Sequence, residues 1–139
     1  MKHELDDTLC RRYPKIFQDR HQSLLHSGMG RGFECGDGWF NLLDTLCELL
    51  QFETDFNRAP QVVATQVKEK LGSLRFYCRQ ANELQRGMIA MAAAMSARTC
   101  EICGCHAKPI NVERSWPVLC DAHATGNATA QQHLNLKGN

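Results

Sequence analysis

The chain has 139 residues and a net charge of +1, which suits one domain, or a small domain with an appended module, and gives no overall attraction to DNA. It lacks both the roughly 20-residue apolar run of a membrane-spanning helix and the apolar region of a signal peptide. We therefore expect a cytoplasmic protein with no membrane partner. In a reducing compartment, its eight cysteines indicate metal binding more than a disulfide framework.

The first half of the chain is predicted to contain two helices separated by a loop. Residues 4–12 read as a short helix, and Pro14 begins a further turn. Residues 26–38 include five glycines and are expected to form a loop. Residues 37–52 repeat apolar side chains at helical spacing, which predicts the main core helix of the protein, with Asp37 as its N-cap.

A β-hairpin is predicted next. Apolar and polar residues alternate from 63 to 67 and again from 74 to 78, on either side of a short glycine turn at residues 70–73. A helix through residues 67–71 is the competing prediction.

Residues 81–97 are rich in alanine, leucine and methionine, which favour a helix. One apolar stripe of this helix consists of Leu84, Met88, Met91 and Met95. We interpret the stripe as core packing, and a methionine-rich groove for a partner is the alternative. Such an apolar surplus permits a homodimer without requiring one, so a monomer and a homodimer both stay open.

Four potential metal ligands follow in the order C-x2-C, sixteen residues, C-x2-H. They are Cys100, Cys103, Cys120 and His123. Thiolate and imidazole are the ligands of tetrahedral Zn²⁺, and four of them fill its coordination, so we predict a structural Zn²⁺ ion rather than a catalytic one. Cys105 and His106, next to the first pair, are alternative ligands. His133 lies too far along the chain from His123 to share the ion.

The residues around these ligands predict a small module. The first pair of ligands stands on a tight turn, residues 107–119 supply two short strands joined by a polar turn at 111–114, and the second pair begins a helix. This order of a tight turn (a zinc knuckle), a hairpin and a helix resembles a treble-clef zinc finger. The predicted fold class is therefore α+β, with a small helical and β-hairpin domain at residues 1–97 and a treble-clef-like zinc module at residues 98–139.

The remaining cysteines raise the question of a thiol enzyme. Cys35 stands just before the predicted core helix, a position that can lower the pKa of a thiol and activate it. A nucleophile also needs a histidine base, and no spacing pairs a histidine with Cys35. We interpret Cys35 as a buried cysteine beside a glycine turn and Cys47 and Cys78 as core thiols. Together with Cys10 they contain no close pair for a second metal site.

Four blocks of sequence indicate a family. They read "RYPKIF", "ECGDGWFNLLDTLC", "VATQVKEKLGSLRFYC", and "RTCEICG" followed by "SWPVLCDAHA". Together they resemble a group of small, mostly uncharacterised proteins encoded by bacteriophages and prophages. The resemblance implies a phage product in the cytoplasm of an infected or lysogenic bacterium, and it transfers no functional residues except the zinc ligands. Leu71 and Ser73 depart from the Phe and Gly expected in the hairpin turn.

The preferred function is a non-enzymatic binder of a host protein or ribonucleoprotein complex, such as an anti-CRISPR-like inhibitor of a bacterial defence system. Residues 32–57 contain six acidic residues and no Lys or Arg, a pattern that suits binding to a basic groove. The candidate contact residues are Asp44, Glu48, Glu53 and Asp55.

Two other classes compete with this function. A nucleic-acid-binding regulator would contact phosphates through Lys68, Lys70, Arg75 and Arg79, with Phe76 and Tyr77 among them. The pI of about 7.6 argues against it, because nucleic-acid-binding domains typically exceed a pI of about 9. A zinc- or thiol-dependent enzyme is the third class, and the sequence contains no complete catalytic constellation for it.

Overall fold

The computed structural model describes residues 1–112 and 115–125, and it confirms a mixed α+β fold with small sheets. In chain order the elements are α1 (His3–Arg12), η1 (Gly28–Arg31), β1 (Phe33–Glu34), η2 (Asp37–Trp39), α2 (Phe40–Asn57), β2 (Val63–Glu69), β3 (Leu74–Arg79), α3 (Glu83–Ser96), β4 (Lys108–Pro109) and β5 (Val118–Leu119), where η marks a 3₁₀ helix. Among the described residues, no helix combines the length and the apolar character needed to cross a membrane.

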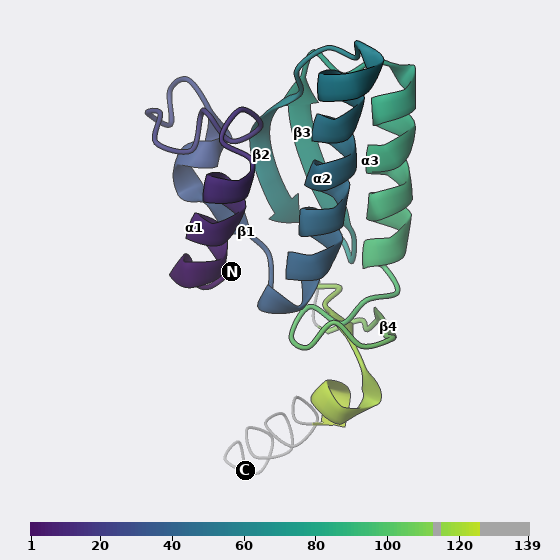
Figure 1. The fold of residues 1–139 in the computed structure, drawn as a ribbon. Helices are drawn as coiled ribbons and strands as arrows, with labels where there is room; N and C mark the ends of the chain where they lie inside the picture. Colours follow the sequence, from purple (N-terminus) through teal and green to yellow (C-terminus); the bar gives the residue numbers. More distant parts are fainter. Residues whose placement is uncertain (113–114, 126–139) are drawn as a thin grey trace, which may run out of the picture.

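A three-stranded sheet stands behind the paired helices α2 and α3 (Figure 1). β2 is its central strand, parallel to β1 and antiparallel to β3. The C-terminal segment with β4 lies beneath the lower ends of α2 and α3. The buried core includes Leu43 and Leu50 from α2 and Val67 and Phe76 from the sheet, so α2 is held by its apolar contact with the strands.

The β-hairpin is confirmed, because β2 and β3 pair in antiparallel register with Val67 opposite Phe76. The competing helix through residues 67–71 is wrong. Leu71 and Gly72 have φ angles of 54° and 75°, in the left-handed region that closes a tight turn and ends a helix.

Two predictions for the segment before α2 are wrong. The glycine-rich region contains the short strand β1, whose Phe33 pairs with Val67, and two residues are too few to produce an alternating pattern. Asp37 does not cap α2, because η2 intervenes and α2 begins at Phe40. The Asp37 carboxylate instead accepts a hydrogen bond from the backbone N–H of Lys2 at 2.7 Å.

The helix predicted at residues 81–97 is confirmed as α3, and a capping box begins it. The side chain of Asn82 accepts from the N–H of Gln85, and the side chain of Gln85 accepts from the N–H of Asn82. The interpretation of its stripe as core is wrong, because Leu84, Met91 and Met95 are 56%, 65% and 47% exposed. These side chains form open surface instead.

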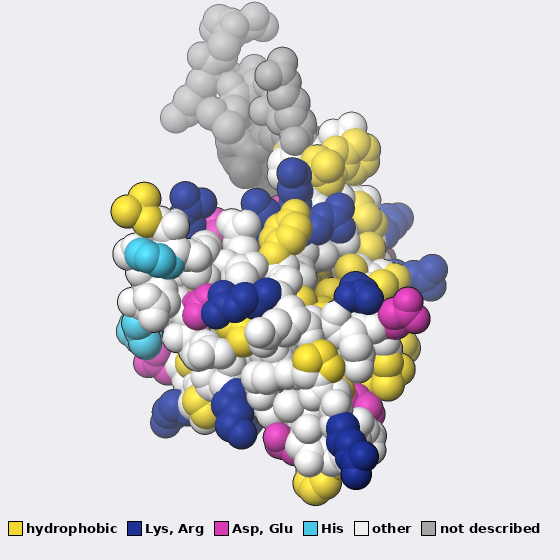
Figure 2. Space-filling view, turned by 90° about the horizontal axis from the view of Figure 1, so that it is seen from above, with side chains coloured by type: hydrophobic (Ala, Val, Ile, Leu, Met, Phe, Trp, Pro, Cys, Tyr) yellow, Lys and Arg dark blue, Asp and Glu magenta, His cyan; other side chains and the backbone are white. Residues whose placement is uncertain are grey.

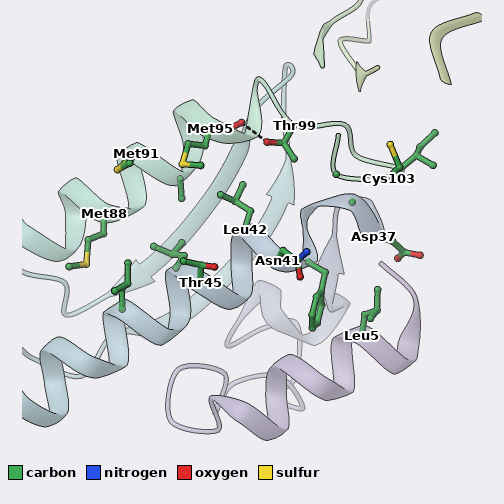
Figure 3. Close-up of a pocket in the computed structure, with 17 residues that line it drawn as sticks. Leu5, Asp37, Asn41, Leu42, Thr45, Met88, Met91, Met95, Thr99 and Cys103 are labelled. Atoms are coloured by element: carbon green, nitrogen blue, oxygen red, sulfur yellow. Dashed lines mark hydrogen bonds between the residues drawn. The ribbon is translucent and has the colours of Figure 1, made fainter. Parts of the chain in front are cut away.

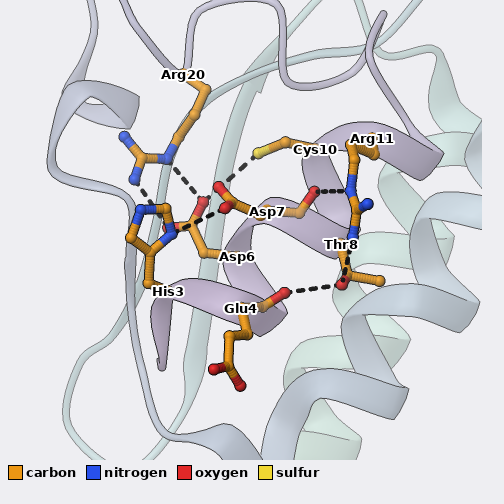
Figure 4. Close-up of polar contacts among 8 residues, drawn as sticks. All are labelled: His3, Glu4, Asp6, Asp7, Thr8, Cys10, Arg11 and Arg20. Carbon is orange, nitrogen blue, oxygen red and sulfur yellow. Dashed lines mark hydrogen bonds and ion pairs between the residues drawn. The ribbon is translucent and has the colours of Figure 1, made fainter.

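A buried ion pair joins α1 to the segment that follows it (Figure 4). The guanidinium of Arg20 donates to both carboxylate oxygens of Asp6, at 2.8 and 3.0 Å, and Asp6 is 5% exposed. Gly32 packs so closely that a Cβ there would lie 2.6 Å from Oδ2 of Asp6. Because a buried charge is costly without its partner, α1 depends on both members of the pair.

Replacing Arg20 with alanine is expected to destabilise the fold by about 3–5 kcal/mol, because the carboxylate of Asp6 would stay buried without its partner. Urea unfolding measures this as a lower midpoint at unchanged slope. Arg11→Ala is the matched control, since Arg11 is exposed on the same helix and bonds to Asp7 and Thr8 within α1. Equal midpoints for the two variants would contradict the prediction.

Candidate metal centre

The four predicted ligands come together at the lower end of the molecule. Their ligand atoms, three Sγ and one imidazole nitrogen, all lie within 4.8 Å of one another. Nδ1 of His123 is 3.2 Å from Sγ of Cys120 and 3.6 Å from Sγ of Cys100. Sγ of Cys103 is 3.7 Å from Sγ of Cys120. The ligands of the two sequence pairs therefore interleave in one cluster.

These spacings match those around a tetrahedral ion. With metal–sulfur bonds of about 2.3 Å and metal–nitrogen bonds of about 2.0 Å, tetrahedral angles separate two sulfurs by about 3.8 Å and a sulfur from a nitrogen by about 3.5 Å. The observed sulfur–sulfur distance is 3.7 Å, and the sulfur–nitrogen distances are 3.2 and 3.6 Å. The cluster is therefore compatible with a metal site whose four positions are all filled by protein ligands.

Local backbone geometry forms each half of the cluster. In the first half, the N–H of Gly104 donates to the carbonyl of Cys100 at 2.9 Å, and the φ of Gly104 is +78°, which favours glycine. The N–H of Cys100 in turn donates to the carbonyl of Cys105 at 2.8 Å. In the second half, the chain leaves β5 and turns into a helix, where the N–H of His123 donates to the carbonyl of Cys120 at 3.0 Å.

Backbone hydrogen bonds favour the thiolate of Cys100. Burial raises the pKa of this thiol, but three backbone N–H groups donate to its Sγ and lower its pKa from 9.0 to about 6. These groups belong to Ile102, Cys103 and Cys120. Since the thiolate is the form that binds a metal, these three N–H groups favour Cys100 as a ligand.

The two alternative ligands lie outside the cluster. Cys105 and His106 are exposed, and neither belongs to the group of four. Cys105 supports the turn instead, since its backbone N–H donates to Sγ of Cys103. His133 lies outside the described residues.

The turn that carries Cys100 and Cys103 packs on η2 at backbone contact distance. A Cβ on Gly38 would lie 2.1 Å from the carbonyl oxygen of Cys100, and a Cβ on Gly36 would lie 2.1 Å from that of Glu101. The N–H of Gly38 donates to the carbonyl of Glu101 at 2.7 Å. Both glycines are therefore required by the turn that packs on them, a role that the sequence analysis missed.

Trp39 provides the second contact between η2 and the turn. Its side chain is fully buried, and its indole N–H donates to the carbonyl of Thr99 at 2.7 Å. Trp39 and Thr99 are 60 positions apart. The G-D-G-W sequence at residues 36–39 is the only local sequence signal for this contact. Thr99, which directly precedes Cys100, is thus fixed to Trp39 at the start of α2.

The buried and half-buried thiols outside the cluster disfavour ionisation. Burial raises the pKa of both Cys10 and Cys35 to about 12. Burial also raises the pKa of Cys47 and of Cys78. Cys35 is consequently a poor nucleophile at neutral pH, and among the described residues the cluster of four is the group whose geometry suits a metal.

The predicted acidic surface is divided by the helix. By helical geometry, Asp44, Glu48 and Asp55 lie within about 40° of one another around the axis of α2, whereas Glu53 lies about 180° from Asp44. Asp44 accepts a hydrogen bond from the hydroxyl of Tyr13 at 2.8 Å. Glu48 and Asp55 are exposed. The part of this surface that is open to a partner is therefore Glu48 and Asp55.

The predicted basic surface is also spread out. Lys68 and Arg75 are direct partners across β2 and β3, and the ammonium of Lys68 is 5.9 Å from the ring centre of Tyr77. Lys70 is exposed at the hairpin turn. The guanidinium of Arg79 pairs with Asp19 at 2.7 Å. In the view from above, Lys and Arg side chains are scattered, with Asp and Glu among them (Figure 2).

A pocket of about 600 Å³ lies between α2 and α3 and reaches the turn that carries Cys103 (Figure 3). Met88, Met91 and Met95 line it from α3, Leu42 lines it from α2, and Cys103 lies at its end. Methionine side chains are flexible and adapt to different apolar surfaces, so this groove suits contact with another helix.

Comparison of the chain with protein-family models, with curated proteins and with solved structures gives no match. The resemblance to phage and prophage proteins therefore stays a prediction.

Replacing Gly38 with alanine is expected to destabilise the fold by about 1–3 kcal/mol, because the new Cβ would overlap the turn that carries Cys100. It should also weaken binding of added Zn²⁺, measured by competition with a chelator. Gly87→Ala is the control, since a Cβ at Gly87 would meet nothing within 4 Å. Unchanged Zn²⁺ affinity and stability in Gly38→Ala would show that the turn does not depend on this contact.

Proposed function

We propose that the four ligands hold a structural Zn²⁺ ion and that residues 98–139 form a treble-clef-like module on the domain of residues 1–97. The presence of three sulfurs and one imidazole nitrogen within 4.8 Å of one another supports Zn²⁺, which prefers such ligands. The order of a tight turn, the β4–β5 hairpin and the helical residues 121–125 supports the treble-clef layout.

We propose further that the protein is not an enzyme. A catalytic zinc site keeps a position open for water or substrate, whereas here four potential protein ligands lie within 4.8 Å of one another, enough to occupy all four positions of one ion. Burial raises the pKa of Cys10, Cys35, Cys47 and Cys78, so these four thiols are not activated nucleophiles. We therefore propose that the protein acts by binding a partner. The observation that carries this proposal is the ligand cluster, in which protein side chains can fill every metal position.

The proposed role is that of a phage- or prophage-encoded cytoplasmic protein that binds a host macromolecule and inhibits a bacterial defence system. This rests on the resemblance in sequence and on the exposed carboxylates of Glu48 and Asp55 on α2. Acidic side chains of this kind suit a basic groove that normally holds nucleic acid.

A nucleic-acid-binding regulator is the second candidate. The observation in its favour is the direct cross-strand pairing of Lys68 with Arg75, because like charges opposite each other are unfavourable unless an anion joins them. Tyr77, 45% exposed beside them, offers a ring on which a base can stack. Arg79 adds less, since Asp19 already neutralises it.

Removing Zn²⁺ with a chelator is expected to unfold the C-terminal third and to lower the melting temperature of the whole chain. Structural zinc contributes roughly 10–16 kcal/mol of apparent binding free energy in isolated finger peptides, more than so small a module gains from its core. Circular dichroism measures the loss, and added Zn²⁺ should reverse it. Elemental analysis confirms that the metal has been removed. If the spectra and the melting temperature of that metal-free chain are unchanged, the proposal is contradicted.

Reversing the exposed acidic charges is expected to weaken capture of a host protein from bacterial lysate. In the double variant Glu48→Lys with Asp55→Lys, we expect about tenfold weaker capture, because like charges would face a basic partner. Asp44 is left unchanged, since its bond to Tyr13 is structural. Quantitative mass spectrometry of the captured protein is the measurement.

Two exposed acidic residues elsewhere provide the charge-matched control, Glu4→Lys with Glu83→Lys. This variant should capture as well as the unmodified chain. Equal loss of capture in both double variants would show that Glu48 and Asp55 do not form the binding surface. Binding to duplex DNA that falls steeply with salt and is abolished by Lys68→Ala with Arg75→Ala would favour the nucleic-acid-binding regulator instead.

A further inference from the structure

The paired helices carry an open apolar face. Leu49, Phe52 and Phe56 follow one another at heptad spacing on α2 and are 47%, 50% and 71% exposed. By helical geometry, Phe52 lies opposite the buried Leu43. A helix that is apolar on two opposite sides normally buries both. α2 therefore presents a second apolar side that the described residues leave uncovered.

The neighbouring helix continues this face. Leu84, Met91 and Met95 on α3 also follow heptad spacing and are about half exposed or more. From residue 87 to residue 97 the chain has no charged residue, although Ala90 and Ala94 are exposed. Solvated helix faces normally carry charge, so this face has the composition of a contact surface.

The open face has the size of a protein interface. The six side chains named above expose on the order of 600 Å² together, taking roughly 200 Å² for each large side chain. That lies at the upper end of the largest apolar patch on a typical monomer, about 300–600 Å². With the groove between the helices and the small side chains of α3, it approaches the roughly 800 Å² that each partner buries in a standard interface.

We propose that a second copy of this chain covers this face and that α2 and α3 of both copies form a four-helix bundle. The two helices are antiparallel, since Gln85 at the start of α3 donates to the carbonyl of Pro60 just beyond the end of α2, at 3.0 Å. An antiparallel pair with heptad-spaced apolar rows is half of such a bundle, and two-fold symmetry lets one surface bind its own copy.

Charge sets the arrangement of the dimer. The apolar row of α2 is flanked by Asp44, Glu48 and Asp55, whereas the exposed side of α3 has no charge from residue 87 onward. Packing α3 against the partner's α3 at the two-fold axis keeps the acidic flanks apart and places them at the rim. The methionines that line the 600 Å³ groove adapt to the partner helix.

Sedimentation equilibrium of the full Zn²⁺-loaded chain at micromolar concentration tests the proposal. The expected mass is twice the 15.7 kDa of one chain. Met91→Lys should reduce it to the mass of one chain, because a charge would then lie at the centre of the interface. Leu25→Lys is the control, since Leu25 is 95% exposed in the segment between α1 and η1, and this variant should stay dimeric.

A second variant separates loss of association from loss of folding. Ala94→Glu keeps a good helix former at an exposed position about 60° from Met91 around the axis of α3, so it should fold with unchanged circular dichroism and sediment as a monomer. A monomeric unmodified chain would overturn the proposal. So would a dimer that survives both Met91→Lys and Ala94→Glu, or a monomer whose groove binds an amphipathic helix of another protein.

Discussion

Two backbone segments that are far apart in the sequence approach each other without side chains between them. Gly38 faces the carbonyl of Cys100 at a distance that no other residue type allows, and Gly36 does the same for Glu101. This contact fixes the turn that carries Cys100 and Cys103 against the start of α2. The groove between α2 and α3 ends at that turn, so the ligand cluster and the open helical face share one structural support.

Much of the candidate site could be predicted from spacing alone. Ligands in short, close pairs are typical of structural zinc sites, and Cys100 with Cys103 and Cys120 with His123 have that spacing. The hairpin and α3 could be predicted as well, because alternation and a capping residue such as Asn82 are local signals.

The rest depends on contacts that leave no local period. β1 exists because Phe33 meets Val67, and a strand of two residues has no pattern of its own. Periodicity also cannot decide which side of α2 is buried. Leu43 and Leu50 recur at the same spacing as Leu49 and Phe56, and only the position of the sheet makes the first two core and leaves the others exposed.

The burial of Trp39 gives the molecule an optical reporter of its own. This indole is shielded from water and bonded to Thr99, next to the first ligand, whereas the other tryptophan, Trp116, is 40% exposed. Emission from the shielded ring is blue-shifted relative to that of the wetted one. The emission wavelength of the intrinsic fluorescence therefore reports, without any label, whether the turn that carries Cys100 packs against the start of α2.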